Sequence, residues 1–294
     1  MTDFIQVFVL GLLAGGLYAL AASGLTLVFG VMNVINVAHG ALLVLGAYLT
    51  WLFWRRTGAD PLLLILVTTP VMFALGWVGY KLFVQRVRGA PAMSVLLTFS
   101  LALVIQGILG EIWSNDFRTV ITSYSNHSFT IGSIVLPKER VFACAIAIVI
   151  LGLLWLMLTR TWLGRAIRAS AENPQGAALI GIELGSVAAL TFAIGVATTG
   201  AGGSLISFSS FFPSTHYLWI SRLLGIIVLG GMGSLSGAFV GALLMGVAEA
   251  MVAKYVPNGL AWVTAVPYMV IFVVLLVRPR GIFGAWTRED VATV

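Results

Sequence analysis

Long apolar runs divide the sequence, and short polar gaps separate them. The runs cover residues 4–29, 34–54, 61–83, 93–113, 141–159, 187–212, 223–253 and 261–277. A helix needs about 20 apolar residues to cross a bilayer. The pattern therefore predicts an all-α integral membrane protein, a polytopic bundle with about 8–9 transmembrane helices.

The composition excludes a water-exposed fold. Hydrophobic residues make up 60% of the chain and charged residues 9%, whereas soluble domains carry about 25% charged residues. The net charge of +6 comes from basic residues spread through the gaps, which predicts anchoring at lipid headgroups and no nucleic-acid binding. Cys144 is the only cysteine, so an intrachain disulfide is excluded. No basic segment precedes the first apolar run, and we expect that run to remain as a span.

The run at 223–253 is too long for one span and contains a glycine-rich interruption at 230–237. Each glycine costs a helix about 1 kcal/mol. We therefore predict one broken segment near 223–237, with a half-helix over 223–229, a glycine turn, and a full span over 238–253. Irregular backbone at membrane depth must be buried in protein or line a cavity. Gly231 and Gly233 are accordingly candidates for the translocation pathway.

The side of the membrane on which each polar gap lies follows from the number of crossings. If the tail after residue 277 is cytoplasmic and the broken run counts as two crossings, the gaps at 84–92 and 160–186 are cytoplasmic as well, and the N-terminus is outside. The distribution of basic residues favours this orientation only weakly, so the count of crossings decides it. The segment 114–140 is then an outer loop, and the alternation of apolar and polar residues at 128–135 predicts a small hairpin.

The polar gap at 162–186 has the signals of two short helices joined by a bend. Arg165 and Arg168 lie on one side of the first. Asn173 and Pro174 form an N-cap and a first-turn proline that start the second, and Gly181 is a suitable end. Such a projection, which we call the knob (residues 162–186), could seat in a groove on a partner. An amphipathic connector lying on lipid headgroups is the alternative.

A few polar residues within the apolar runs are candidates for function. Asn36 and His39 are three residues apart and would share a helix face, either as an interhelix hydrogen bond or as a wall of the pathway. Glu249 is the only carboxylate deep in a well-defined predicted span, where a charge is expensive. It would pair with Lys254 or Arg222, or contact the ammonium group of a substrate.

Four ordered blocks carry a family resemblance. They are the motif GLTLVFG at 24–30 with NVAHG at 36–40, the knob segment 163–182, the glycine-rich stretch 228–250, and PRGIFG at 279–284. Together they span nearly the whole chain, which resembles the permease subunits of branched-chain amino-acid ABC importers, in particular the H-type subunit. Where the family pattern has an acidic residue after Glu172, this chain has Asn173 followed by Pro174.

The resemblance implies a single transmembrane permease domain over 1–294, in the bacterial cytoplasmic (inner) membrane, that forms half of a translocation pathway. The implied partners are a second, M-type permease, two ATP-binding subunits, and a periplasmic or surface substrate-binding protein. The segment 160–186 would be the coupling loop that moves the spans between alternating-access states. The residues implied in coupling to the ATPase are Arg165, Arg168, Glu172, Asn173, Pro174, Ala177, Ala178, Gly181 and Ile182.

The sequence offers no chemistry of its own. It lacks the Gly-x-x-x-x-Gly-Lys-Ser/Thr motif that cradles ATP phosphates, and we expect no catalytic residue, metal site or cofactor. Branched-chain or other hydrophobic amino acids are the expected substrates, with urea and short amides left open. A stand-alone secondary transporter or channel is an alternative, although such proteins bury more ionisable residues. A membrane-embedded enzyme is a second alternative, which lacks paired catalytic carboxylates.

Overall fold

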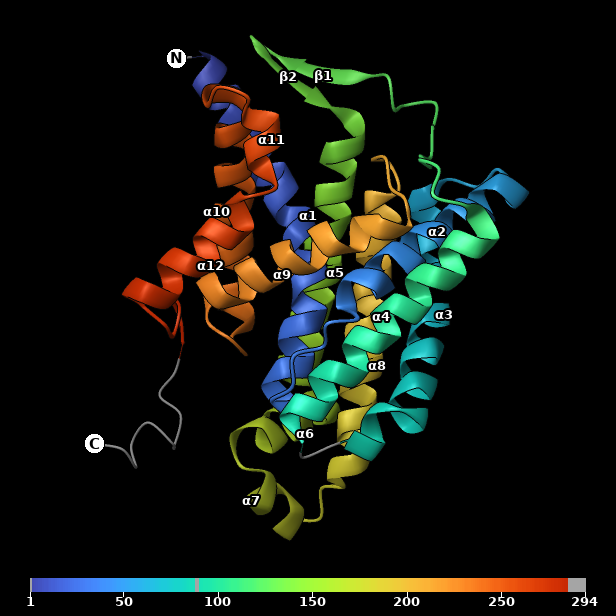
Figure 1. The fold of residues 1–294 in the computed structure, drawn as a ribbon, viewed down its shortest axis with the longest axis vertical. Helices are drawn as coiled ribbons and strands as arrows, with labels where there is room; N and C mark the ends of the chain where they lie inside the picture. Colours follow the sequence, from blue (N-terminus) through green and yellow to red (C-terminus); the bar gives the residue numbers. More distant parts are fainter. Residues whose placement is uncertain (1, 88–89, 285–294) are drawn as a thin grey trace.

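The computed structural model describes residues 2–87 and 90–284, and helices make up most of that part of the chain (Figure 1). The domain predicted over 1–294 also includes residues 1, 88–89 and 285–294, which lie outside the described residues. The elements are α1 (Thr2–Met32), α2 (His39–Thr57), α3 (Pro61–Leu82), η1 (Val84–Val87), α4 (Pro91–Trp113), β1 (Ser128–Ile131), β2 (Ile134–Pro137), α5 (Lys138–Arg160), α6 (Trp162–Glu172), α7 (Pro174–Leu179), α8 (Leu184–Ile206), η2 (Pro213–Thr215), α9 (His216–Gly230), α10 (Leu235–Tyr255), α11 (Gly259–Val263) and α12 (Val266–Val277).

Each of the first six apolar runs corresponds to one long helix, and each of the last two is divided between two helices. Within the described residues, six helices are long and apolar enough to cross a membrane: α1, α3, α4, α5, α8 and α10. The chain is therefore an all-α, multi-pass membrane protein. Because α2, α9 and α12 fall short in length or hydropathy, these criteria do not establish the predicted count of 8–9 crossings.

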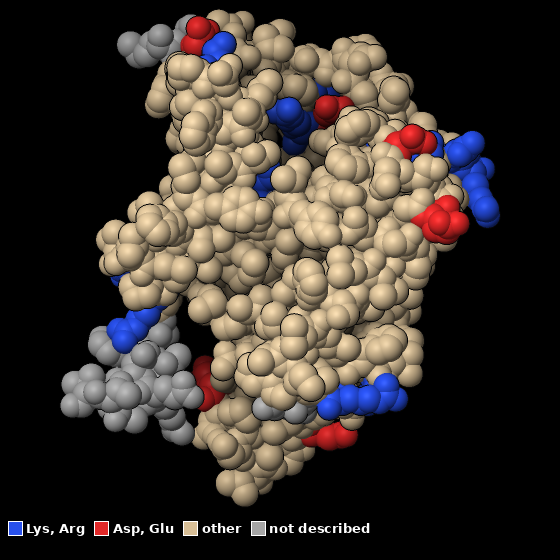
Figure 2. Space-filling view, in the orientation of Figure 1, with Lys and Arg blue, Asp and Glu red and all other residues tan. Residues whose placement is uncertain are grey.

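The two ends of the bundle carry different structures. The N-terminus, the β1–β2 hairpin and α11 lie at one end, and α6 and α7 lie at the opposite end (Figure 1). On the face in Figure 2, most charged side chains lie near these ends, and the middle is almost wholly uncharged. This is the arrangement expected of a protein whose waist contacts lipid.

The predicted hairpin is confirmed. β1 and β2 pair antiparallel, with Ile131 opposite Ile134 at the turn. The segment before β1 is fixed to the bundle by Tyr124, whose hydroxyl donates a hydrogen bond of 2.9 Å to Asp60 at the start of α3. Burial, together with this hydrogen bond, raises the pKa of Tyr124 well above its usual value, so the phenol stays protonated and remains a donor.

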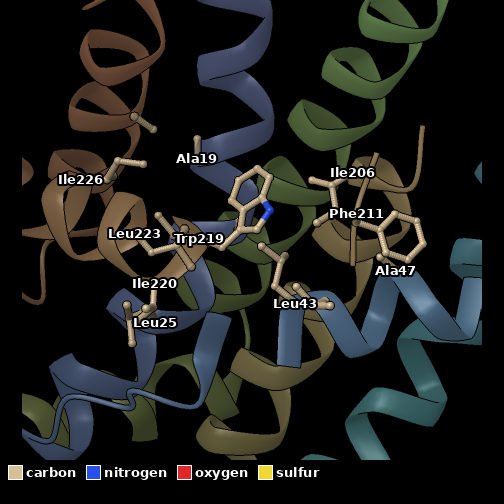
Figure 3. Packing of buried hydrophobic residues seen from close by; sticks show 14 of the residues in the cluster. Ala19, Leu25, Leu43, Ala47, Ile206, Phe211, Trp219, Ile220, Leu223 and Ile226 are labelled. Atoms are coloured by element: carbon tan, nitrogen blue, oxygen red, sulfur yellow. The ribbon is translucent and has the colours of Figure 1, made fainter. Parts of the chain in front are cut away.

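α8 is the most deeply buried long helix in the described chain, packed between α1, α2 and α3. The largest buried cluster lies beside it (Figure 3). It joins residues of α1, α2 and α9 to the segment after α8, among them Leu25, Leu43, Ala47, Phe211, Trp219 and Leu223. Association of helices in lipid depends on van der Waals packing rather than on a hydrophobic drive. Close fit at α8 therefore determines how these helices are arranged.

Glycines set the distance between α2 and α8. A Cβ on Gly46 would lie 2.9 Å from the Cα of Gly200. A Cβ on Gly203 would overlap the carbonyl oxygen of Leu43 and lie 2.8 Å from the backbone nitrogen of Ala47. Small residues at such positions let helix backbones approach closely.

Replacing Gly203 by Ala is expected to destabilise the bundle by about 1–3 kcal/mol, the usual cost of overpacking. Backbone atoms surround the new methyl group, so neighbouring side chains cannot relieve the overlap. Thermal denaturation in detergent, followed by size-exclusion chromatography, measures the loss. Gly107→Ala on α4 is the matched control, because nothing lies within 4 Å of its Cβ position. Equal losses in the two variants would contradict the packing account.

The broken segment is present, but its first half is longer than predicted. α9 begins at His216 rather than at residue 223, because polar residues in its first two turns conceal the helix from a hydropathy pattern. A turn follows, in which Gly231 has a φ of 102° and Gly233 a φ of 85°, the left-handed region that glycine adopts without strain. Ser234 then caps α10 by accepting a hydrogen bond of 3.1 Å from the backbone nitrogen of Gly237.

Candidate functional site

The knob consists of α6 and α7, at the end of the bundle opposite the N-terminus (Figure 1). Thr161 caps α6 by accepting from the backbone nitrogen of Gly164 at 3.0 Å. Asn173 caps α7 in the same way, accepting from Gly176 at 3.1 Å, and Pro174 occupies the first turn as predicted. Gly181, with a φ of 86°, follows the end of α7.

The tip of the knob is apolar and exposed. Leu179 is 88% exposed and Ile180 is 76% exposed, and Ala178 beside them is exposed too. Arg165, Arg168 and Glu172 also face outward, whereas Ile182 is half-buried. We call Ala178, Leu179 and Ile180 the knob tip.

The structure corrects the expectation for Ala177. Its side chain is only 3% exposed, because α7 packs against α6 and α8. Its carbonyl oxygen accepts a hydrogen bond of 3.0 Å from the backbone nitrogen of Ile182, which closes the end of the helix. Ala177 therefore packs inside the knob, and the surface available to a partner is the knob tip.

Replacing Asn173 by Ala is expected to destabilise α7 by about 1 kcal/mol, the usual cost of losing an N-cap. A helix of 6 residues has little stability of its own, so the tip should open more often. Hydrogen exchange of residues 174–182 would then be faster. Asn173→Asp keeps an acceptor at the cap and should exchange at the original rate. Equal exchange in the two variants would show that the cap contributes nothing.

His39 and Asn36 do not share a helix face. α2 begins at His39, and Asn36 lies in the non-helical connection before it, after Asn33, whose φ is 52°. The Asn36 side-chain oxygen accepts from the backbone nitrogen of Ala38 at 3.1 Å. The connection thus turns the chain before the helix starts, which separation along the sequence did not reveal.

His39 joins α2 to α8. Its Nε2 lies 2.5 Å from the hydroxyl of Thr199, which donates to the carbonyl oxygen of Gly195 at 2.7 Å. His39 is fully buried. This contact is an interhelix hydrogen bond, and a role for Asn36 or His39 in the pathway stays a prediction.

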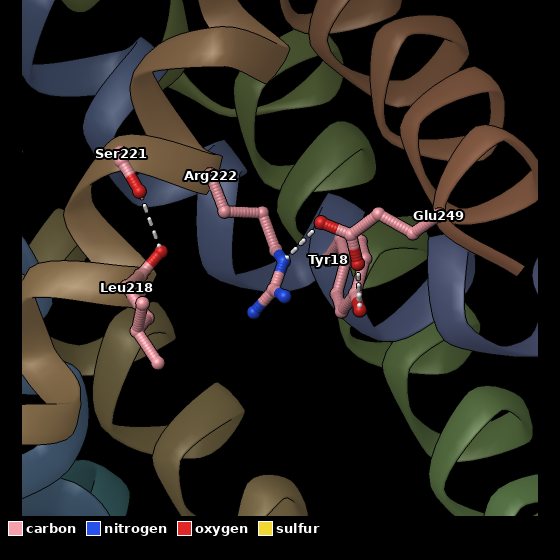
Figure 4. Close-up of polar contacts among 5 residues, drawn as sticks. All are labelled: Tyr18, Leu218, Ser221, Arg222 and Glu249. Carbon is pink, nitrogen blue, oxygen red and sulfur yellow. Dashed lines mark hydrogen bonds and ion pairs between the residues drawn. The ribbon is translucent and has the colours of Figure 1, made fainter. Parts of the chain in front are cut away.

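Glu249 forms a buried polar cluster with two residues from other helices (Figure 4). One carboxylate oxygen accepts from Nε of Arg222 at 2.6 Å, and the other accepts from the hydroxyl of Tyr18 at 2.7 Å. The guanidinium carbon of Arg222 lies 4.9 Å from the ring centre of Tyr18 and 4.8 Å from that of Trp219. Of the two cations expected beside Glu249, Arg222 makes the contact.

The glycine turn contacts the C-terminal motif. The backbone nitrogens of Ile282 and Phe283 donate to the carbonyl oxygens of Leu229 and Gly230, each at 2.9 Å. A Cβ on Gly231 would lie 2.6 Å from the nitrogen of Gly284, so Gly231 is enclosed. Gly233 is exposed, and a role of the two glycines in the pathway stays a prediction.

In the part of the chain that the structure describes, no group of three or more His, Cys, Asp or Glu residues could hold a metal ion.

A model of one protein family matches most of the sequence. It is described as the permease component of branched-chain amino acid transport systems, and it matches residues 7–275. The chain belongs to this permease family. A member is a membrane component of a transport system and not an enzyme.

Curated relatives match over nearly the full length. The high-affinity branched-chain amino acid transport permease BraD of Pseudomonas aeruginosa is 30% identical over 98% of both chains. LivH of Salmonella typhimurium, with the same description, is 28% identical over 98% of both. A probable LivH of Methanocaldococcus jannaschii is 26% identical over 92% of this chain and 90% of its own. No solved structure matches significantly.

For this permease, sequence reasoning singled out the knob, Glu249 and His39. It did not predict that Tyr18 contacts Glu249 or that Thr199 contacts His39. Tyr18 is 231 residues from Glu249 and Thr199 is 160 residues from His39. The only available signal was a polar side chain within an apolar run, and several residues share that property.

Proposed function

We propose that this permease forms half of the translocation pathway of an ATP-driven importer of branched-chain or other hydrophobic amino acids. Family membership supports the class of transporter, and the names of the relatives support the substrate. The observation that carries the coupling mechanism is the exposed knob tip. Two large apolar side chains are exposed at the end opposite the N-terminus, which suits insertion into a groove on an ATP-binding partner.

The proposed topology has nine crossings, within the predicted range of 8–9. α2 has 19 residues and would be about 28 Å long, close to the thickness of the hydrocarbon core. With α9, α10 and α12 as further crossings, an odd number of helices separates the two ends of the chain. Five long helices precede the knob, which supports a cytoplasmic knob and an outer N-terminus.

The proposed partners follow from the class. They are a second, M-type permease, two ATP-binding subunits and a periplasmic or surface substrate-binding protein, assembled in the bacterial inner membrane. The residues proposed to contact or support the ATP-binding subunit are Arg165, Arg168, Glu172, Asn173, Pro174, Ala178, Leu179, Ile180, Gly181 and Ile182. ATP binding would move the knob, and the knob would move the spans between outward- and inward-open states.

Uptake in a strain that lacks its own leucine transport tests the proposal. We expect radiolabelled leucine to accumulate only when the permease is expressed with its partners and the ATP-binding subunit can hydrolyse ATP. Uptake that follows a proton or sodium gradient and needs no ATP-binding subunit would support a stand-alone secondary transporter instead. A complex that hydrolyses ATP yet moves no hydrophobic amino acid would contradict the substrate class.

A further inference from the structure

A cavity of about 620 Å³ lies between α1, α5, α9 and α10. Basic side chains lie in a hollow toward the N-terminal end of the face in Figure 2. Arg140, Lys254 and Glu139 line the cavity near the helix ends at that side, so its lining there has a net positive charge. Its volume is within the range of about 300–1,000 Å³ that small-molecule sites occupy.

A second polar part of the cavity wall is the cluster of Arg222, Glu249 and Tyr18. The Arg222 side chain is 14% exposed and the Glu249 side chain 6% exposed. Only Nε of Arg222 makes a hydrogen bond to the described residues, and it goes to Glu249. In Figure 4 the two terminal nitrogens of Arg222 point away from that carboxylate.

The terminal nitrogens of Arg222 can therefore donate hydrogen bonds to a ligand. The Nε bond to Glu249 and the rings of Tyr18 and Trp219 fix the orientation of the guanidinium. The terminal nitrogens form a fork whose geometry matches a carboxylate. These nitrogens are not among the buried atoms without a partner in the described chain, and Arg222 lines the cavity, so a ligand in the cavity can reach them.

Most of the remaining wall is apolar and suits an aliphatic side chain. It comes mainly from α1, α9 and the segment after α10: Val7, Leu10, Leu13, Leu17, Leu218 and Leu260. The cavity therefore combines the guanidinium of Arg222, the carboxylate of Glu249 and an apolar wall. An α-amino acid with an apolar side chain presents the complementary groups.

We propose that this cavity is an outer binding site for a free, apolar α-amino acid. The ligand's carboxylate binds the terminal nitrogens of Arg222, its ammonium group lies toward Glu249, and its side chain packs on the leucines of α1 and α9. The basic lining near the outer end attracts the carboxylate toward the site. This inference rests on the proposed function and adds the residues that recognise the substrate.

Protection of a single cysteine tests the site directly. Cys144 is replaced by Ala, Ala250→Cys places a thiol on the cavity wall outside the proposed ligand contacts, and the permease complex is reconstituted in nanodiscs without the binding protein. A membrane-impermeant methanethiosulfonate then labels the thiol. At leucine about ten times its half-saturating concentration, labelling should slow about tenfold, because only empty sites react. 3-Methylbutylamine, which lacks the carboxylate, should not protect.

Two outcomes of this labelling would overturn the proposal. Equal protection by leucine and 3-methylbutylamine would show that the carboxylate is not recognised. Labelling that is slow without leucine, becomes fast once lipid is stripped in detergent, and never responds to leucine would assign the cavity to a lipid.

The double variant Arg222→Gln/Glu249→Gln separates binding from folding. Two amides can hydrogen-bond to each other without burying a charge, so the protein should fold while leucine protection and uptake are lost. Normal protection in a folded double variant would overturn the proposal. If the double variant does not fold, Arg222→Lys decides. It keeps the charge but loses the fork, and it should raise the half-saturating leucine concentration about tenfold, the effect of losing one charge-assisted hydrogen bond. An unchanged value would overturn the proposal.

The unmodified complex distinguishes this inference from the proposed function. If the unmodified complex imports leucine with ATP, and the cysteine variant does so too while leucine never protects its thiol, the cavity assignment is wrong and the transport function stands. If the unmodified complex imports no hydrophobic amino acid at all, the proposed function itself is wrong.

Discussion

Replacing Leu179 by Asp is expected to abolish ATP-driven uptake while the permease stays inserted and folded. Leu179 is 88% exposed, so a carboxylate there remains in water and costs the isolated permease almost nothing. In a groove of the ATP-binding subunit, the same carboxylate would lose its water without gaining a partner. Leucine uptake and the amount of permease in the membrane, measured on the same cells, give the result.

Ile131→Asp is the matched control for this substitution. Ile131 is 67% exposed, but it lies in the hairpin at the opposite end of the bundle. Uptake by Ile131→Asp should stay close to that of the unmodified protein, because the proposed contact with the ATP-binding subunit lies at the knob end. Normal uptake by Leu179→Asp, at equal expression, would show that the knob tip is not the coupling surface.

Replacing Arg222 by Ala is expected to destabilise the permease by about 3–5 kcal/mol, the usual effect of removing one partner of a buried ion pair. Glu249, only 5% exposed, would keep its hydrogen bond from Tyr18 but lose its counter-charge. Thermal denaturation of the purified protein measures the change. The amount of folded permease in membranes should fall with it.

The variant Arg222→Met/Glu249→Met tests the cause of that loss. It removes both charges and keeps similar volume, and such replacements of a buried pair are often neutral or stabilising. Stability close to that of the unmodified permease would assign the loss in Arg222→Ala to the unpaired carboxylate. If the Met pair is as unstable as the single variant, or if Arg222→Ala is fully stable, the ion pair does not hold α9 against α10.

Local signals predicted the parts of this protein that depend on neighbouring residues. Asn173 and Pro174 start α7 as expected, and the glycines at 231 and 233 break the α9–α10 segment where expected. The alternation near residue 131 predicted the hairpin. In each case the hydrogen bonds or dihedral angles involve residues a few positions apart, so the sequence pattern contains the information.

Predictions that depended on distant contacts were less successful. The start of α9 was placed too late, since His216 reads as polar in the sequence although packing in the bundle buries it. Ala177 was expected at a partner surface, but packing of α7 on the bundle buries it. The closeness of Tyr18 to Glu249 depends on how α1 packs along α10, and no local pattern reports that.

The central claim is that the knob tip touches the ATP-binding subunit, and photo-crosslinking measures this contact most directly. A photoreactive benzoylphenylalanine replaces Leu179 in the complete transport system, and a second sample carries it at Leu103, an exposed position on α4. We predict that position 179 crosslinks to the ATP-binding subunit in intact membranes and that position 103 does not. Crosslinks from position 179 to lipid alone, in a complex that still imports leucine, would contradict the account.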